Sequence, residues 1–551
     1  MSRTTVPRRA STTIIIRDQG GALQVLMLRR SQSASFMPGA YVFPGGAVDA
    51  GDASPEWGSR CDESRAALAT RLGLDDDAAL GHAVAALREC FEECGLWLGC
   101  DEADARALAA ARQRLHAGAS GMAAISFELG LPLATSALQP WSHWVTPIDA
   151  PKRFDTRFFV ALAPPGQQPT VDECETITLV WVNPADALAQ HAKAELPLEF
   201  ATRCTLASLL PFDSAAALMR YARYARAPRE MATVHPRVAR TAGGERRVLL
   251  PQDAAYAEVM RVDPEGTGSA RCTLDAGVAT QLASTVWRTT APNPGMMTGP
   301  GTNSYLVGRD GEFVVIDPGP AIEVHIEALL TAGRGRLRAV LVTHTHTDHS
   351  PAAERIAART GVPRIGLAPP LHGRQDRGFA PERQPGDGER FELAGCVLQA
   401  IHTPGHASNH VCWWLEEERM LFTGDHVMQG STVVIDPPDG DMAAYLASLA
   451  ALPQRLPLLE CLAPGHGFLI DRPHFAIERL LQHRRTRETK VTAALRANGA
   501  SALPALVVAV YADVPEQRHA VAQRSLLAHL LKLRDEGVVA ESAGVWRLNV
   551  D

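Results

Sequence analysis

The sequence predicts a multidomain α/β protein, and three observations carry this prediction. The chain has 551 residues, enough for several domains of roughly 150 residues each. Short apolar runs of strand length alternate with longer helical patterns along the chain. Several of these runs lead into polar loops, as at the strand ends of α/β enzymes. We expect folded regions over 8–228, 281–480 and 481–551, with a linker and edge segment over 229–280.

The composition excludes several protein classes. Hydrophobic residues make up 46% and charged residues 21%, which excludes disordered, collagen-like and coiled-coil chains. A net charge of −7 indicates no whole-protein attraction to nucleic acid or to an anionic membrane. Ten cysteines occur without any CxxC pair, which favours reduced thiols. Because no apolar run is long enough for a membrane span or a signal peptide, we expect a soluble cytoplasmic protein with no membrane partner.

The order of the expected elements follows from periodicity and from proline positions. Alternating apolar residues predict strands near the start, a turn follows at FPGG, and Pro184 suits the first turn of a helix. The elements expected in the first region are strands over 12–17, 23–30, 157–163 and 178–182, and helices over 81–98, from 184, and over 206–225 as one long stretch.

The second half predicts catalytic loops followed by a small helical tail. Apolar runs over 313–316 and 339–342 lead directly into Asp317 and His344. Beyond Gly467 the pattern becomes helical and includes a basic stretch, and the tail over 502–548 predicts two helices and a hairpin.

Three glutamates share one face of the helix expected in the first region. In RECFEECGL, Glu89 and Glu93 are four residues apart, and Glu92 is three residues after Glu89. Crowded carboxylates repel one another unless a cation lies among them. Oxygen ligands suit Mg²⁺ or Mn²⁺, which would connect this face to the phosphates of a substrate. On charge alone, a solvated acidic helix end is the alternative.

This string resembles the second half of the Nudix box, REUxEExGU, with Cys90 and Leu96 at its apolar positions. The first half, GxxxxxE, begins at Gly46, with Asp52 in place of the glutamate. Residues 53–87 fill the gap between the halves, which resembles the branch of Nudix hydrolases that includes the peroxisomal coenzyme A diphosphatases. The segments FPGGAVDAGDASPEW and PKRFDTRFFVALAPPGQ are similar to other signatures of that branch.

The resemblance implies a Nudix α/β/α sandwich that cleaves a diphosphate linkage in a small molecule of the coenzyme A or nucleotide type. The helix carboxylates would hold Mg²⁺ or Mn²⁺ and supply the base, and an arginine would orient one of them by bidentate pairing. For the two arginines of the later segment, a surface-charge role is the alternative to phosphate binding. The residues implied are Glu89, Glu92, Glu93 and Arg88 for catalysis, and Gly45, Gly46, Arg153 and Arg157 for substrate binding.

Histidines gather between residues 344 and 466. In LVTHTHTDHS an apolar strand runs into His344 and His346, which alternation places on one side, and the turn adds Asp348 and His349. The motifs HTPGH, FTGDH and APGHG follow, each with a glycine that lets the backbone turn tightly around a small ion. Imidazoles with a few carboxylates suit Zn²⁺, whereas Mg²⁺ prefers oxygen ligands.

The ordered motifs resemble the metallo-β-lactamase superfamily over about 281–480, which implies an αββα sandwich with two zinc ions. Zinc lowers the pKa of bound water to about 7, so such a site supplies a nucleophile at neutral pH, which Asp348 would orient. Asp317 matches the supporting acidic residue of the family, and His402, His410 and His426 are expected to be structural neighbours. The implied ligands are His344, His346 and His406 for one zinc, Asp348, His349 and His466 for the other, and Asp425 as the bridge.

Three segments favour single-stranded RNA as the substrate of the zinc half. GTNSYLVG, WWLEEERMLFTGDHVMQGSTVV and HRRTRET resemble the lactamase-like endoribonuclease branch, which ends in a winged-helix-type domain. A basic stretch could follow phosphates, with a solvated helix face as the alternative. Two other hypotheses remain: a thioester hydrolase of the glyoxalase II kind acting on acyl-CoA, and a non-catalytic tail that binds nucleic acid or protein. The basic residues are His483, Arg484, Arg485, Arg487 and Lys490.

Overall fold

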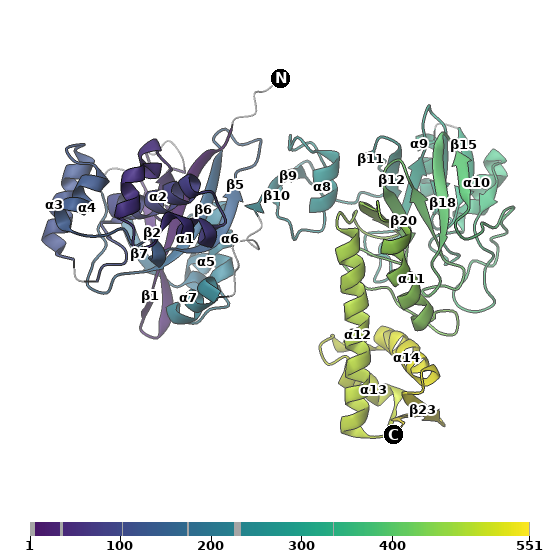
Figure 1. The fold of residues 1–551 in the computed structure, drawn as a ribbon. Helices are drawn as coiled ribbons and strands as arrows, with labels where there is room; N and C mark the ends of the chain where they lie inside the picture. Colours follow the sequence, from purple (N-terminus) through teal and green to yellow (C-terminus); the bar gives the residue numbers. More distant parts are fainter. Residues whose placement is uncertain are drawn as a thin grey trace. The chain divides into compact units, whose positions relative to one another are not determined.

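The computed structural model describes residues 6–33, 37–101, 103–172, 176–224, 233–333 and 336–549. The chain divides into two compact units, Met1–Pro236 and Arg237–Asp551 (Figure 1). The fold is the multidomain α/β architecture that the sequence predicts. Among the described residues, no helix combines the length and the apolar character needed to cross a membrane.

The first unit is built on a mixed sheet with helices on both faces. Its strand order is β3-β2-β1-β6-β5-β8, and β4 and β7 pair with β1 and β2. Ile14, Ile15 and Ile16 of β1 are all buried, because the helices leave neither face of this central strand exposed to water. The strands are β1 (Arg8–Gln19), β2 (Ala22–Arg30), β3 (Tyr41–Val42), β4 (Gly45–Ala47), β5 (Gln139–Val145), β6 (Phe154–Leu162), β7 (Thr176–Val182) and β8 (Thr233–Val234).

Two groups of helices cover this sheet and complete an α/β/α sandwich. Ile15 packs with the first group, whereas Ile14 and Ile16 pack with the second. Figure 1 shows α2 crossing the sheet. The first group is α1 (Arg65–Leu72), α2 (Asp76–Cys94), α3 (Ala105–His116) and α4 (Met122–Leu129); the second is α5 (Pro184–Ala192), α6 (Phe200–Leu209) and α7 (Ala215–Tyr224).

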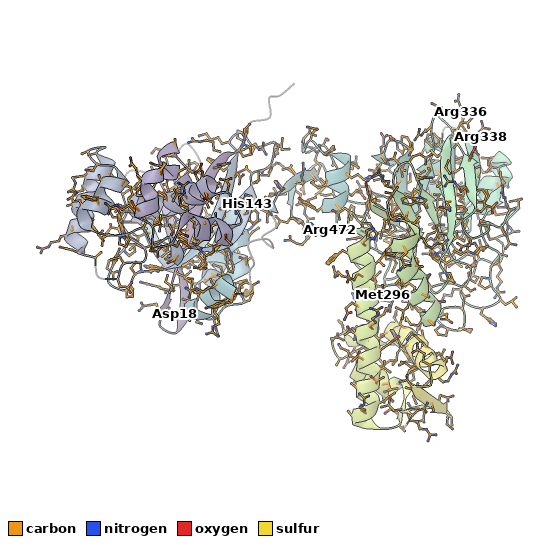
Figure 2. All side chains as sticks on the ribbon, viewed as in Figure 1. Asp18, His143, Met296, Arg336, Arg338 and Arg472 are labelled. Atoms are coloured by element: carbon orange, nitrogen blue, oxygen red, sulfur yellow. The ribbon has the colours of Figure 1, made fainter. Side chains whose placement is uncertain are left out.

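The expected single helix over 206–225 is wrong, because two helices occupy this stretch. Pro211 lacks a backbone N–H and restricts the residue before it, so the helix ends at Leu209. The next helix, α7, begins where the backbone N–H of Ala215 donates to Oδ1 of Asp18 at 2.7 Å, near the end of β1 (Figure 2). The helix that carries the glutamates spans Asp76–Cys94 and not the expected 81–98, and it ends at Gly95, whose φ is +70°.

Residues 237–280, which lie in the expected linker and edge segment over 229–280, are folded. They form β9 (Arg237–Arg240), β10 (Arg246–Leu249) and α8 (Tyr256–Val262), with an apolar cluster of their own. Glu258 of α8 makes a buried ion pair with Arg288 of the following sheet, with Nη2 and Oε1 2.8 Å apart. Because removing one partner of such a pair costs roughly 3–5 kcal/mol, this segment is an integral part of the second unit.

The second unit contains two sheets packed face to face with helices outside, an αββα sandwich. Apolar residues of both sheets form one shared core. Helices α9 (Glu323–Ala332) and α10 (Ala352–Thr360) pack on the first sheet, and α11 (Met442–Arg455) packs on the second. The first sheet is β11 (Thr280–Ala283), β12 (Val286–Thr290), β13 (Asn303–Val307), β14 (Phe313–Ile316), β15 (Leu337–Leu341) and β16 (Arg364–Ile365); the second is β17 (Arg390–Leu393), β18 (Cys396–His402), β19 (Val411–Leu415), β20 (Met420–Gly424) and β21 (Cys461–Pro464).

The long helix α12 leads from this sandwich into a small domain of the winged-helix type. The two helices and the hairpin expected in the tail are confirmed. The small domain has its own apolar core, and a short strand completes its sheet in the order β22-β24-β23. Its elements are α12 (Pro473–Asn498), β22 (Ser501–Ala502), α13 (Leu503–Val510), α14 (His519–Asp535), β23 (Val539–Ser542) and β24 (Val545–Leu548).

Candidate functional site

The structure brings together all seven residues for which the sequence predicts zinc binding. They lie in loops that follow β15, β18, β20 and β21, so the carboxyl ends of strands from both sheets supply them. In each group, the ligand atoms lie within 4.8 Å of one another. The three groups are His344, His346 and His406; His344, His349 and Asp425; and Asp348, His349 and His466.

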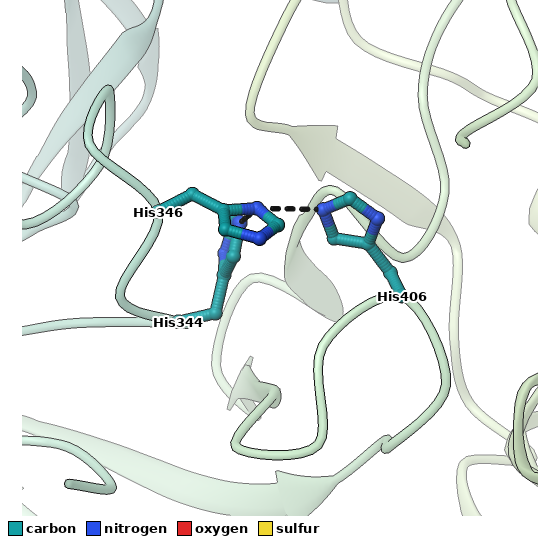
Figure 3. A group of neighbouring side chains, drawn as sticks. All are labelled: His344, His346 and His406. Atoms are coloured by element: carbon teal, nitrogen blue, oxygen red, sulfur yellow. Dashed lines mark hydrogen bonds between the residues drawn. The ribbon is translucent and has the colours of Figure 1, made fainter. Parts of the chain in front are cut away.

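In the first group, three imidazole rings converge on one point. Nε2 of His344 and Nε2 of His406 each lie 3.0 Å from Nδ1 of His346 (Figure 3). The rings of His344 and His406 stand nearly perpendicular to the ring of His346, at 81° and 82°. The rings therefore present their nitrogens to one another and do not stack.

The proton of His344 is located by its neighbours. Oγ1 of Thr343 donates its hydrogen to Oδ2 of Asp317 at 2.7 Å. The hydroxyl can then only accept from Nδ1 of His344, which is 3.0 Å away. Burial holds the pKa of His344 well below its ordinary value, so the ring is neutral. Its Nε2 atom carries no hydrogen and offers a lone pair.

A carbonyl fixes the tautomer of His406 in the same sense. Nδ1 of His406 donates to the carbonyl oxygen of Val434 at 2.8 Å, so this ring hydrogen lies on Nδ1 and Nε2 directs its lone pair toward His346. Two lone pairs, from His344 and His406, thus face Nδ1 of His346, which can carry only one hydrogen. A cation among the three nitrogens would satisfy them all.

Two further imidazoles follow the same rule. Nδ1 of His349 donates to Oδ2 of Asp317 at 2.9 Å, and Nδ1 of His466 donates to the carbonyl oxygen of Gly301 at 3.1 Å. Nε2 of both rings and Oδ1 of Asp425 are buried without a hydrogen-bond partner among the described residues. Such orphaned atoms, all facing one another, fit a metal site.

The carboxylates connect the two groups. Oδ1 of Asp425 lies 3.5 Å from Nε2 of His349 and 3.3 Å from Nε2 of His466, while Oδ2 lies 3.7 Å from Nε2 of His406. Asp425 therefore faces both groups, as a bridging ligand would. Oδ2 of Asp348 lies 3.3 Å from Nε2 of His466 on the more exposed side. These residues fit two divalent cations, and zinc is the prediction that their nitrogen-rich chemistry supports.

Charge differs between the two groups. Burial and His406 lower the pKa of His346 to about 3. Burial also lowers the pKa of His466, but Asp425 and Asp348 outweigh burial and raise it to about 9. Burial alone would raise the pKa of Asp348, but His349 and His466 lower it to about 2. Without metal, the second group therefore holds protons that a cation must displace.

Some supporting residues lie outside the predicted set. Nδ2 of Asn303 donates to the carbonyl oxygens of Pro464 and Gly467, at 3.0 and 2.8 Å, and so closes the loop that carries His466. A Cβ atom at Gly465 would lie 2.7 Å from Cε1 of His349, which explains the glycine. Asn303 occurs in the segment GTNSYLVG, so a signal for it was present in the sequence.

In the first unit, Arg88 organises the carboxylates predicted for catalysis. Its guanidinium donates to Oε1 of Glu89 and Oε2 of Glu92, both at 2.8 Å. It also makes a bidentate pair with Asp52, at 2.9 and 3.0 Å. Asp52 thus occupies the place of the motif glutamate despite the intervening residues 53–87. Because Arg88 lies between Glu89 and Glu92, no three of the predicted carboxylates come close enough together to form a metal-binding group among the described residues.

The loop at FPGG lies directly against this helix. The backbone N–H of Gly45 donates to Oε2 of Glu93 at 2.9 Å. A Cβ atom at Gly46 would lie 2.3 Å from Oε1 of Glu89, so only glycine fits there. Burial raises the pKa of Glu89 to about 7, against the opposing effect of Arg88. A carboxyl group with this pKa is suited to proton transfer near neutral pH.

Three further arginines of the first unit bond to backbone carbonyl oxygens. Arg112 of α3, which the sequence did not single out, donates to the carbonyl oxygen of Glu92 at 2.9 and 2.7 Å and holds the end of the glutamate helix. Arg153 donates to the carbonyl oxygen of Thr146 in the β5–β6 hairpin, and Arg157 lies near the end of α1, 3.5 Å from the carbonyl oxygen of Leu72. Phosphate binding by Arg153 and Arg157 stays a prediction.

The basic stretch expected to follow RNA is largely buried. Arg484 is 2% exposed and donates to the carbonyl oxygen of Val433, and Arg487 is 7% exposed and pairs with Asp513. Lys490 pairs with the same carboxylate at 2.9 Å, and burial, together with Arg484, lowers the pKa of His483 to about 4. Arg485 is exposed. The expectation that Arg484 and Arg487 contact phosphates is therefore wrong, because both side chains are buried and bonded to other parts of the protein.

Comparison with known families agrees with this geometry. The model of the metallo-beta-lactamase superfamily matches residues 297–466, and the model of the beta-lactamase associated winged helix domain matches residues 503–546. The model of the NUDT19 Nudix domain matches residues 8–79 and 69–201. Both catalytic families consist of hydrolases that depend on metal ions.

Individual relatives cover the second unit or the first. The lactamase-like protein adaB of Aspergillus niger is 34% identical over 258 residues, which are 43% of this chain and 76% of adaB. An atrochrysone carboxyl ACP thioesterase of Aspergillus chevalieri is 32% identical over 267 residues, 46% of this chain and 82% of the enzyme. A Nudix hydrolase structure from Alicyclobacillus acidocaldarius is 31% identical, with a TM-score of 0.33, and covers 39% of this chain and 96% of its own.

The protonation states predict a difference in how pH affects metal binding. Below about pH 9 a proton on His466 competes with the metal, so affinity at the Asp348–His349–His466 group should rise with pH, by about tenfold per unit for each displaced proton. Neutral His344 and His346 impose no such competition. Chelator competition between pH 6 and 9 should therefore find one pH-dependent zinc equivalent. Two equivalents with equal pH dependence would contradict this assignment.

The contact at Gly46 predicts the effect of one methyl group. Gly46→Ala should displace the carboxylate of Glu89 and reduce magnesium-dependent diphosphate hydrolysis by about a hundredfold. Gly51→Ala is the matched control, because no atom lies within 4 Å of its added Cβ. Initial rates of both variants, with circular dichroism to confirm folding, provide the measurement. Equal activity of the two variants would remove the close-approach role of Gly46.

Proposed function

Because the chain belongs to the metallo-β-lactamase superfamily and carries a Nudix domain in its first unit, we propose that it is a hydrolase with two independent sites. The second unit hydrolyses thioesters, and the first unit hydrolyses a diphosphate linkage in a molecule of the coenzyme A type. The observation that carries the thioester assignment is the 32% identity to an ACP thioesterase over 267 residues. The thioester hypothesis thus moves ahead of the RNA hypothesis that the sequence favoured.

The burial of the arginines supports this preference. Only Arg485 among the three arginines of the basic stretch remains at the surface, so Arg484 and Arg487 are not available to a phosphate backbone. The loop before Gly301, whose carbonyl oxygen accepts from His466, presents apolar side chains to solvent: Met296, labelled in Figure 2, is 74% exposed, and Met297 is 47% exposed. Flexible methionines of this kind suit an acyl chain better than a ribose-phosphate backbone.

The pairing of the two units agrees with one substrate class. Acyl-CoA contains both a thioester and a diphosphate, so two hydrolases of these types in one chain can act on different bonds of the same kind of molecule. The Nudix half then requires Mg²⁺ or Mn²⁺, and the other half requires zinc. Hydrolysis at both bonds yields a carboxylic acid, an adenosine phosphate and a phosphopantetheine fragment.

The residues of the second unit have defined roles in thioester hydrolysis. The seven candidate ligands would hold two zinc ions, which would supply an activated water at neutral pH and polarise the carbonyl of the substrate. Asp348, with its low pKa, stays ionised and orients that water by accepting its hydrogen bond. Asp317 holds His349 directly and His344 through Thr343, so the nitrogens keep their direction throughout the reaction.

Phosphodiester hydrolysis on single-stranded RNA is the second candidate. The winged-helix domain favours it, since domains of this type often bind nucleic acid, and Arg485 is available for a phosphate. The metal site itself is compatible with either bond.

The choice of bond can be tested directly. Zinc-loaded protein should hydrolyse acyl-CoA, and His406→Ala should reduce this activity by at least a hundredfold, because it removes a ligand nitrogen. Arg485→Gln should leave the rate unchanged. If RNA is the substrate, the same Arg485→Gln change should lower the slope of log affinity against log salt by roughly 0.7. RNA cleavage with this salt effect and without acyl-CoA turnover would decide against the thioester proposal.

The independence of the two sites is the next prediction. Glu92→Gln with Glu93→Gln should abolish diphosphate hydrolysis while thioester hydrolysis continues, because the changes remove charge from the first unit and preserve side-chain shape. His406→Ala should have the opposite effect. Assays of both products on each folded variant give the answer. Loss of both activities in either variant would mean that the sites act as one.

A further inference from the structure

The segment Val433–Ile435 connects the zinc ligand His406 to the C-terminal domain. On one side, the carbonyl oxygen of Val434 accepts from Nδ1 of His406 at 2.8 Å. On the other side, the carbonyl oxygen of Val433 accepts from Nη2 of Arg484. The backbone N–H of Ile435 donates to Oγ of Ser525 at 3.2 Å. Three consecutive residues are thus bonded to α12, to α14 and to a ligand ring.

Arg484 also supports the site through Tyr445. Its guanidinium lies over the ring of Tyr445, 5.4 Å from the centroid. A Cβ atom at Gly405, the residue before His406, would lie 2.3 Å from Cα of Tyr445, so Tyr445 is packed tightly against the ligand loop. The hydroxyl of Tyr445 donates to the carbonyl oxygen of His426 at 3.0 Å, next to the bridging Asp425. Through Tyr445, Arg484 is therefore connected to the loops that carry His406 and Asp425.

We propose that Arg484 is a positioning residue for the metal site, acting through Val433–Ile435 to keep Nε2 of His406 directed at the metal. The direction of this lone pair depends on the carbonyl of Val434, and that carbonyl depends on the bonds of its two neighbours. Arg484 is buried and makes these contacts from α12, whose Ile477 also packs in the apolar cluster of the second sheet. The C-terminal domain thereby becomes part of the metal site. The inference rests on the proposed role of His406 as a ligand, and not on the bond that is cleaved.

The same helix supplies a matched control. Arg487, one turn further along α12, is also buried, but it donates to the carbonyl oxygen of Val510 at 2.8 Å and to Oδ1 of Asp513 at 2.6 Å. These partners belong to the C-terminal domain itself. A loss of Arg487 therefore tests the effect of removing a buried arginine that has no path to His406.

The test compares zinc affinity in the full-length variants Arg484→Met and Arg487→Met by competition with a chromophoric chelator. Changes in residues that orient metal ligands typically weaken affinity 10–100-fold, and we expect about tenfold weaker binding of one zinc equivalent in Arg484→Met. The Co²⁺ spectrum of this variant should also change. Arg487→Met should lower the denaturation midpoint without altering zinc affinity or the spectrum. Unchanged affinity in Arg484→Met, or equal loss in both variants, would overturn the proposal.

Two further variants keep the test decisive. If Arg484→Met does not fold, Ser525→Ala removes only the bond to Ile435, and it should weaken one zinc equivalent by a few-fold; unchanged affinity there overturns the proposal as well. His406→Ala separates the two levels of inference. If His406→Ala retains both zinc equivalents, the proposed metal site itself fails. If it loses one while Arg484→Met and Ser525→Ala retain both, only the positioning role fails.

Discussion

The second unit depends on one constraint: four of the five imidazoles in the candidate metal site must donate their Nδ1 hydrogen outward so that Nε2 faces the site, whereas His346 presents Nδ1 to it. His349 donates to Asp317, His406 to Val434 and His466 to Gly301. These acceptors lie in different segments of the sandwich, so the tautomers are set by the packing of the whole unit. A shift in any of these segments would redirect a lone pair by rotating a ring.

The first unit solves the problem of crowded charge by other means. Its carboxylates are held by Arg88, whose guanidinium reaches Asp52, Glu89 and Glu92 at once. Here the protein supplies the cation, whereas in the second unit the buried nitrogens and carboxylates need a metal to satisfy them. For Mg²⁺ to bind between the glutamates, Arg88 must release at least one of them. Burial raises the pKa of Glu89, and the opposing effect of Arg88 is too small to cancel it.

The seven candidate ligands could be named from the sequence because each lies in a short motif, at the end of an apolar strand, that resembles those of the metallo-β-lactamase superfamily. Val434 and Gly301 were not predictable, since they act through backbone carbonyls that any residue supplies. The burial of Arg484 was predictable from its spacing to apolar residues, although its charge suggests an exposed position. Ile477, Arg484 and Val491 recur every seven residues, and all three are buried on one face of α12. The end of α6 before α7 was predictable from Pro211, because a proline restricts the residue before it.

The role of the C-terminal domain follows from where the two buried arginines of α12 point. A domain that reads a phosphate backbone places its arginines in solvent, where they can exchange counterions for phosphates. Here α12 directs Arg484 to the loop beside His406 and Arg487 to Asp513, so both charges are consumed within the protein. The bonds from α12 and α14 to the loop beside His406 therefore give this domain a supporting role in the proposed metal site. The physical reason to prefer an acyl thioester to RNA is that two of the arginines predicted to contact phosphates are buried within the protein.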